Sequence, residues 1–267
     1  MVGRSQGGNI VLLAVSAGNS HITFGAHENG VWTRRWRIQT VHAKTADEYL
    51  VIFRELFKAA GLPIDTIESS ILSSVFPPLT GTLVETLLAL TGTPPLFLGP
   101  GLDTGLRVTT ENPAEVGTDL VANAVAAFDR FRGNCIVVDF GTALSFTAVA
   151  APGELRGVAI APGLTGAMES LARNTAQLPT VPLTAPPEAI GRTTVHSIQA
   201  GIVLGYIGLV AEIIRRMRGE LGGAADVVAT GGQSGIMAPL LAEPVVHEQW
   251  LTLEGLRIIA ERITRAR

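Results

Sequence analysis

Residues 16–20 read Ser-Ala-Gly-Asn-Ser, and a similar stretch, Asp-Phe-Gly-Thr-Ala, returns at residues 139–143. Each stretch lies between two strand-like runs, at 11–15 and 21–25 in the first copy and at 135–138 and 144–149 in the second. This pattern predicts two β-hairpins, each closed by a tight turn of glycine and hydroxyl residues. The repetition of one unit predicts two domains of related fold.

Tight turns of this kind direct backbone N–H groups toward an anion such as a phosphate. We interpret Gly18, Asn19 and Ser20 in the first turn as candidate phosphate-binding residues, together with Gly141 and Thr142 in the second. A single turn of this composition is also common as a plain connection between strands. The repetition in equivalent settings is what favours an ATP-dependent phosphotransferase, in which two such turns hold the nucleotide.

Length and composition limit the other possibilities. The chain has 267 residues and is 47% hydrophobic, enough for two domains with substantial cores, which we expect at residues 1–115 and 116–267. A formal net charge of −3 provides no general basic field, so we do not expect nucleic acid as a partner. The apolar stretch at 201–211 is about half a membrane span, and residues 1–9 lack the pattern of a signal peptide. We therefore expect a cytoplasmic protein with no membrane partner.

Hydrophobic spacing along the chain predicts an α/β protein. Strands and helices alternate after the first hairpin, and helices are more frequent in the second half. The further strands are expected at 31–40, 67–75, 95–98, 155–160 and 226–229, and the helices at 45–62, 79–90, 112–131, 164–173, 194–221, 232–241 and 252–264. Thr45 with Glu48 forms a capping-box pattern, and Asn112-Pro113 is typical of a cap followed by a first-turn proline.

Two carboxylates are candidates for chemistry because of their surroundings. Asp139 ends an apolar strand, where it either projects toward a cation or caps the turn behind it, and we favour the cation. Asp119 lies among Val116, Leu120 and Val121 in a predicted helix. A lone carboxylate in an apolar setting is costly unless it is partnered or functional, so a catalytic role and a surface role both stay open for Asp119.

The sequence Thr230-Gly231-Gly232 joins a predicted strand to a predicted helix. Glycines at such a junction let the backbone approach a ligand such as a nucleoside. A simple tight turn is the alternative interpretation.

Taken in order, these residues resemble the type III pantothenate kinase family, a member of the acetate and sugar kinase, Hsp70 and actin superfamily. The resemblance covers nearly the whole chain, and so many ordered matches are specific for the family. It rests on both turns, on Gly117-Thr118-Asp119 and on Thr230-Gly231-Gly232-Gln233. Further matching stretches are 99–105, 112–123, 162–163, 174–179 and 191–194, with Gly201.

The resemblance implies two actin-like domains of the ribonuclease H-like fold with a nucleotide cleft between them, and a homodimer. It also implies an activity, the ATP-dependent phosphorylation of pantothenate to 4′-phosphopantothenate in the first step of coenzyme A biosynthesis. The implied cofactors are ATP, Mg²⁺ and a monovalent cation, either K⁺ or NH₄⁺.

The same resemblance implies roles for individual residues. Asp119 would be the general base, and Asp139 would help to hold the monovalent cation. The residues at the ATP phosphates and nucleotide would be Ser16, Gly18, Asn19, Ser20, Gly141, Thr142, Gly231 and Gly232. The pantothenate pocket would be formed by Gly99, Pro100, Gly101, Thr104, Gly105, Gly117, Thr118 and Thr194, the last from the partner subunit.

Two residues depart from the usual pattern of the family. Ser16 stands where the family usually has Asp, and Leu120 stands where it usually has Arg. Serine cannot supply a charge near the metal and phosphates, and leucine cannot form a bidentate contact with a substrate carboxylate. The alternative hypothesis is therefore a non-catalytic or altered-acceptor homologue that binds a nucleotide or a partner.

Overall fold

The computed structural model describes residues 11–266. The expectation that residues 1–9 carry no signal peptide lies outside this range. Within residues 11–266 two compact units are present, the first formed by residues 11–105, 114–122 and 252–266 and the second by residues 106–113 and 123–251. This division differs from the continuous halves 1–115 and 116–267, because the C-terminal helix groups with the N-terminal strands.

The first unit is built on a sheet of five strands in the order β3-β2-β1-β4-β5. The strands are β1 (Val11–Ala17), β2 (His21–Glu28), β3 (Val31–Gln39), β4 (Ile67–Ser74) and β5 (Leu96–Phe97). The predicted first hairpin is confirmed, since β1 and β2 are antiparallel neighbours. Strand β4 pairs in parallel with β1 and so returns to the far side of the hairpin.

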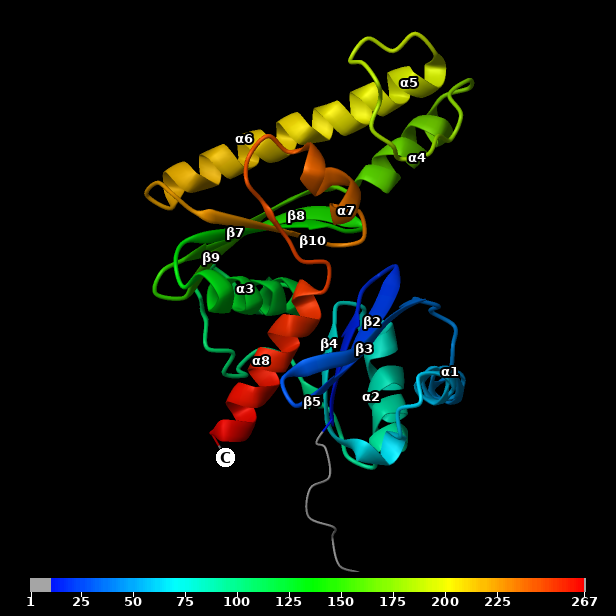
Figure 1. Cartoon of the computed structure of the whole chain (residues 1–267), viewed down its shortest axis with the longest axis vertical. Helices are drawn as coiled ribbons and strands as arrows, with labels where there is room; N and C mark the ends of the chain where they lie inside the picture. Colours follow the sequence, from blue (N-terminus) through cyan, green and yellow to red (C-terminus); the bar gives the residue numbers. More distant parts are fainter. Residues whose placement is uncertain (1–10, 267) are drawn as a thin grey trace, which may run out of the picture. The chain divides into compact units, whose positions relative to one another are not determined.

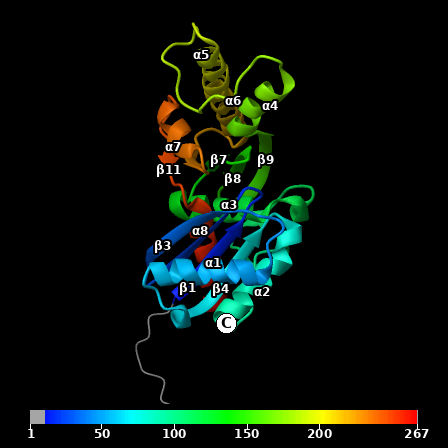
Figure 2. The same cartoon turned by 90° about the vertical axis from the view of Figure 1, so that its right-hand side faces the viewer.

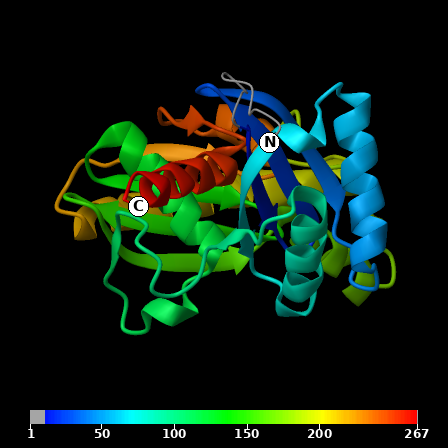
Figure 3. The same cartoon turned by 90° about the horizontal axis from the view of Figure 1, so that it is seen from below.

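Alternation along the strands of the first unit explains its hydrophobic core. Leu13, Val15, Ile22 and Phe24 alternate with smaller or polar residues and are fully buried. Their side chains cluster with buried aromatic and aliphatic residues of helices α1 (Ala46–Ala59) and α2 (Pro77–Thr91), which lie beside this sheet (Figures 2 and 3).

The cap of helix α1 confirms the prediction made for Thr45. The Thr45 hydroxyl accepts a hydrogen bond from the Glu48 N–H, and the Glu48 carboxylate accepts one from the Thr45 N–H at 2.8 Å. This reciprocal bonding satisfies two of the N–H groups that a helix start otherwise leaves without partners.

Helix α8 (Leu251–Arg265) is held to the first sheet by polar contacts. The Trp32 Nε1–H on β3 donates to Glu254 Oε2 at 2.8 Å, and Arg257 bonds both Glu254 and Glu261 at 2.6 Å. Helix α8 also passes very close to residue Ala122, because a Cβ built on Gly255 would lie 1.8 Å from the Ala122 carbonyl oxygen. Only glycine fits at this crossing.

The second unit repeats the plan of the first with a sheet of six strands in the order β11-β10-β7-β8-β9-β6. The strands are β6 (Arg107–Val108), β7 (Cys135–Phe140), β8 (Ala143–Ala150), β9 (Glu154–Pro162), β10 (Asp226–Thr230) and β11 (Val246–His247). Strands β7, β8 and β9 are antiparallel, and β10 is parallel to β7 as β4 is to β1. The predicted repeat is confirmed, whereas the short strands β6 and β11 were not predicted.

The helices of the second unit are α4 (Leu164–Asn174), α5 (Thr194–Gln199), α6 (Gly205–Glu220) and α7 (Ser234–Met237). Helix α3 (Thr118–Phe131) belongs to this unit from residue 123 onward, and α3 and α6 lie on opposite faces of the sheet (Figure 1). A π-helix, Ala200–Leu204, joins α5 to α6, so the predicted helix 194–221 contains a local change of winding. The predicted helix 232–241 is the short α7 followed by a 3₁₀ turn at Ala238–Leu240.

The expected helix 112–131 is wrong at its start. Residues Pro113–Glu115 form a 3₁₀ turn, and helix α3 (Thr118–Phe131) begins only after Gly117. Asn112 is therefore not a cap of this helix. The correction moves Asp119 from the middle of a helix to its first turn, where helix geometry favours a carboxylate.

The helical run Thr194–Glu220 confirms the predicted helix at 194–221, but it is apolar over more of its length than the stretch at 201–211 alone indicated. Its 27 residues are sufficient in length and composition to cross a membrane, and a third of the most apolar window is buried. Core helices of proteins without a membrane have the same length and composition. This feature alone therefore does not indicate a membrane.

The crossing at Gly255 generates a prediction about stability. Gly255→Ala should lower the free energy of unfolding by about 2 kcal/mol or more, because the new methyl group overlaps a backbone carbonyl that cannot rotate away. Gly219→Ala in helix α6 is the control, since nothing lies within 4 Å of a Cβ built there and alanine is the better helix former. Urea unfolding of both variants measures the difference, and equal stability of the two would contradict the close crossing.

Candidate active site

The first glycine turn connects β1 to β2 and is braced by the end of β3. The Gly18 N–H donates to the His21 carbonyl at 2.9 Å, and Thr40 donates from its hydroxyl to the Gly18 carbonyl at 2.8 Å. The Thr40 N–H also donates to the Ser20 carbonyl at 2.9 Å. Asn19 is exposed at the tip. The turn is therefore held rigidly at its base while its tip remains accessible, as a phosphate-binding turn requires.

Ser16 lies in β1 among hydroxyl side chains rather than carboxylates. It is buried, and its register partners are Thr23 on β2 and Ser73 on β4. The Ser73 hydroxyl is 2.7 Å from the hydroxyl of Thr118, the first residue of helix α3. The first unit therefore presents a neutral, polar cluster at this point, where the family pattern would place a charge.

Asp119 is the candidate general base, and its surroundings suit it to accept a proton. It is half-buried in the first turn of α3, and its Oδ1 accepts a hydrogen bond from the Leu120 N–H at 2.8 Å. Burial raises the pKa of Asp119, although backbone hydrogen bonds from Leu120 and from its own N–H oppose that shift. Gly117 makes room for this carboxylate, because a Cβ at that position would lie 2.6 Å from Asp119 Oδ1.

The predicted pantothenate loop at 99–105 is a loop in the structure and is tied to helix α8. Gly101 and Gly105 adopt positive φ angles of 88° and 81°, which only glycine adopts without strain. Asp103 accepts hydrogen bonds at 3.0 Å from the Gly105 N–H and from Arg262 Nε. Thr104 is buried. These contacts give the loop one defined shape.

Asp139 occupies in the second unit the position that Ser16 occupies in the first. Its register partners are Ser145 on β8 and Thr230 on β10, which correspond to Thr23 and Ser73. Asp139 Oδ2 accepts a hydrogen bond from Asn123 Nδ2 at 3.1 Å. The carboxylate thus lies among neutral polar groups, a setting that suits a cation ligand.

The second glycine turn, at Gly141 and Thr142, rests on the start of helix α4. The Gly141 N–H donates to Ala143 O at 3.1 Å, and the Gly163 N–H donates to Thr142 O at 3.2 Å. A Cβ on Gly163 would lie 2.4 Å from Thr142 O. Gly163 is thus required for the close approach between the turn and helix α4.

The Thr230–Gly232 turn lies directly against the second glycine turn. Gly231 has a φ of +93°, and a Cβ built on it would lie 2.3 Å from Asp139 Oδ1. The Gln233 N–H donates to the Phe140 carbonyl at 3.1 Å. The structure therefore brings together two stretches that lie far apart in the sequence, both of which were predicted to contact the nucleotide.

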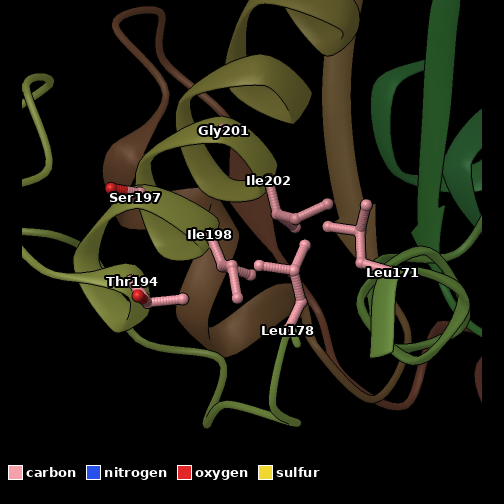
Figure 4. A pocket seen from close by; sticks show the side chains of 7 residues that line it. All are labelled: Leu171, Leu178, Thr194, Ser197, Ile198, Gly201 and Ile202. Carbon is pink, nitrogen blue, oxygen red and sulfur yellow. The ribbon is translucent and has the colours of Figure 1, made fainter. Parts of the chain in front are cut away.

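Thr194 begins helix α5, and its neighbours in the cavity described next are not residues of these turns. It helps to line a cavity of about 280 Å³ together with Leu171, Leu178, Ser197, Ile198, Gly201 and Ile202. Figure 4 shows four aliphatic side chains of this group pointing toward one another, with Thr194 and Ser197 to one side. The cavity is apolar and is suited to a hydrocarbon group rather than to phosphates.

Comparison with known proteins identifies the group to which this arrangement belongs. A family model described as type III pantothenate kinase matches residues 12–216. A type III pantothenate kinase from Anaeromyxobacter sp. (strain Fw109-5) is 47% identical over 252 residues, which are 94% of this chain and 99% of that protein. The corresponding protein of Geobacter sulfurreducens is 46% identical with the same coverage. The chain belongs to the type III pantothenate kinase family.

Solved structures confirm the fold predicted from the family resemblance. MreB 5 of Spiroplasma citri, solved with bound AMPPNP, aligns with a TM-score of 0.57 and 8% sequence identity over 96% of this chain and 97% of that chain. At this identity the likeness concerns the fold alone. The chain therefore has the actin-like fold, with its two hairpins at equivalent places in two related sheets.

Some contacts of this kinase were missed by the sequence analysis. Asn123, Thr165 and Gln233 hold the second turn or its neighbours, since Gln233 Nε2 donates to the Thr165 hydroxyl. Asn123 could have been found from the sequence, because it follows Asp119 by four residues and so lies on the same side of the helix as Asp119. Gln233 belongs to the matching stretch 230–233, but its contact with Thr165 had no signal in the sequence, because the two residues meet only in space.

The contact between Gly231 and Asp139 yields a prediction. Gly231→Ala should weaken ATP binding at least about tenfold, because the methyl group must displace the Asp139 carboxylate and the Phe140 backbone. Gly222→Ala is the matched control, since Gly222 has a similar φ of +85° but nothing within 4 Å of its Cβ position. Both variants carry the same backbone strain, so calorimetric titration with ATP isolates the contact. Equal ATP affinity of the two variants would show that this contact does not matter for binding.

Proposed function

We propose that this protein transfers the γ-phosphoryl group of ATP to the hydroxyl of pantothenate, which yields 4′-phosphopantothenate in the first step of coenzyme A biosynthesis. Family membership over 94% of the chain supports this reaction. The observation that carries it in the structure is Asp119, a half-buried carboxylate at a helix start, next to a glycine that leaves it room. We also propose a cytoplasmic location, without nucleic acid or membrane as partner.

In the proposed reaction Asp119 accepts the proton of the pantothenate hydroxyl. The hydroxyl oxygen then forms a bond to the γ-phosphorus while the bond from that phosphorus to the β,γ-bridging oxygen breaks, and ADP leaves. Burial raises the pKa of Asp119, which makes it a better proton acceptor than an ordinary carboxylate. The glycine turns at 18–20 and 141–142 each offer backbone N–H groups to phosphate oxygens, and Gly231 and Gly232 contact the nucleotide.

A divalent cation fits this site as a partner of the phosphates. Residues 11–266 contain no group of three or more His, Cys, Asp and Glu side chains that could hold a metal ion alone. Mg²⁺ is commonly bound by one or two carboxylates together with substrate phosphates and water, and it neutralises charge that develops on the phosphoryl group. Asp139, oriented by Asn123, is the carboxylate that we propose for the monovalent cation, either K⁺ or NH₄⁺.

The acceptor site is proposed to use the ordered loop and the residues before helix α3. Gly99, Pro100, Gly101, Thr104 and Gly105 shape the loop, and Gly117 with Thr118 adjoins the general base. Leu120 supplies no charge for the pantothenate carboxylate. Binding of that carboxylate is therefore expected to depend on hydroxyl and backbone N–H donors.

The decisive experiment is a coupled assay of ADP release with ATP, Mg²⁺, a K⁺ or NH₄⁺ salt and pantothenate. The wild type should show pantothenate-dependent turnover, and Asp119→Asn should lower kcat at least about a hundredfold because the amide cannot accept the proton. Asp129→Asn, near the end of the same helix with a side chain 41% exposed, is the matched control and should keep full activity. A folded wild type that binds ATP but phosphorylates no pantothenate would favour the non-catalytic or altered-acceptor alternative.

The thermal stability of Asp119→Asn shows whether a loss of activity comes from lost catalysis or from lost structure. The raised pKa of Asp119 means that its ionised form costs folding stability once the pH exceeds the ordinary aspartate pKa of about 3.9. Asp119→Asn should therefore melt at a higher temperature than the wild type at pH 7.5, and this gain should disappear below about pH 4. A variant that is less stable at pH 7.5 would argue against a desolvated carboxylate.

We also propose a homodimer in which Thr194 of one subunit contributes to the pantothenate pocket of the other. The helical run that begins at Thr194 leaves Val195 38% exposed and Leu204 40% exposed, so it offers apolar surface for a second copy. Sedimentation equilibrium at micromolar concentration should give the mass of two chains. A monomer at that concentration would contradict the shared pocket.

A further inference from the structure

A buried hydroxyl and a histidine meet beside the Thr230–Gly232 turn. Ser234, the first residue of α7, is fully buried, and its Oγ lies 2.7 Å from the Gly231 carbonyl oxygen and 2.9 Å from His247 Nε2. His247 ends strand β11, which pairs in parallel with β10. The Glu248 N–H donates to the Ala229 carbonyl at 2.9 Å and anchors the residue after the histidine.

The hydrogen-bond geometry determines where the protons lie. A serine hydroxyl has one proton to donate, and here it goes to the Gly231 carbonyl, because a carbonyl can only accept. Ser234 Oγ must then accept the proton on His247 Nε2. Both the neutral Nε2–H tautomer and the imidazolium ion satisfy this arrangement. Ser234 is therefore not an activated nucleophile, since the histidine donates to it instead of removing its proton.

The pair acts on one peptide group. The Gly231 carbonyl also accepts the Ser234 N–H at 3.3 Å, so two donors from the same residue hold its oxygen. In a planar trans peptide the N–H of Gly232 points opposite to that carbonyl. Fixing the Gly231 oxygen thus fixes the direction of the Gly232 N–H, on an exposed residue adjoining the contact between Gly231 and Asp139.

We infer that Ser234 and His247 are positioning residues for the nucleotide, which orient the Gly231–Gly232 peptide so that its N–H is presented to ATP. The inference rests on the proposed function, because it assigns the ligand of this turn as the ATP of the kinase reaction. Ser234 is buried and His247 lies on a short edge strand, so both residues act on the ligand indirectly, through the glycine turn.

The test compares variants of the pair in the full-length protein. His247→Leu and Ser234→Ala should each raise the Kd for ATP, measured by calorimetry, and the KM for ATP about tenfold, because each removes a donor that orients the turn. The kcat and the KM for pantothenate should stay within about twofold of the wild type. His247→Gln should restore ATP binding, since its terminal amide offers an N–H at a similar reach.

Two controls keep the outcome decisive. His42→Leu makes the same substitution at an exposed histidine of the first unit, whose ring stacks on Phe76, and should leave the Kd for ATP unchanged. The double variant Ser234→Ala, His247→Leu should bind ATP no more weakly than the worse single variant, because the two residues act as one unit. Additive losses, or loss of activity without loss of ATP affinity, would overturn the inference.

Nitrogen-15 NMR of His247 adds a readout that does not depend on turnover. A proton resident on Nε2 is expected, and a deprotonated Nε2 at neutral pH would overturn the inference. Unchanged ATP affinity in His247→Leu, with pantothenate-dependent turnover in the wild type, would overturn the inference and leave the proposed function intact. Weakened ATP affinity in that variant, with no pantothenate turnover in the wild type, would support the inference and overturn the choice of acceptor. A wild type that binds no ATP would overturn both.

Discussion

The arrangement of the candidate site depends on two parallel strand pairs. Strand β1 pairs with β4 in the first unit, and β7 pairs with β10 in the second. In a parallel pair the carboxyl ends of both strands lie at the same edge of the sheet, so the residues at those ends become neighbours. In the first unit this pairing sets Ser16 beside Ser73, and in the second it sets Asp139 beside Thr230. The stretches that follow the paired strands therefore meet, which is why the turn after β10 lies against the turn after β7.

The two units use the same backbone plan with different chemistry. The first surrounds Ser16 with the hydroxyls of Thr23 and Ser73, whereas the second surrounds Asp139 with hydroxyl residues and the amide of Asn123. A buried hydroxyl needs only a hydrogen-bond partner, while a buried carboxylate requires a cation or strong donors. Of the two equivalent strand ends, only the one in the second unit therefore carries a charge, on Asp139. In the first unit, Asp119 at the start of α3 is the carboxylate that we propose as the general base.

Glycine determines how closely these parts approach one another. Gly117 leaves room for the Asp119 carboxylate, Gly163 for the Thr142 carbonyl and Gly231 for Asp139. In each case a methyl group would lie 2.6 Å or less from a polar oxygen, closer than real Cβ contacts. A phosphate-binding site made from backbone N–H groups requires such approaches, because side chains would hold the backbone segments apart.

The sequence by itself determined the repeated hairpins, the α/β class, the capped helix α1 and the family, since each is expressed by residues close together in the chain. It also identified the glycine turns as candidates, because they recur in equivalent settings, and Asp119 and Asp139, because they lie in apolar surroundings. The start of α3, the strand β11 and the contact of Asn123 with Asp139 were decided only by tertiary structure. Pro113 and the apolar residues after it are compatible with a longer helix, and the break at Gly117 arises where residues 114–122 pack in the first unit. The Ser234–His247 pair depends on β11 lying beside β10, a contact with no local signal in the sequence, because two-residue strands have too few side chains to show a period.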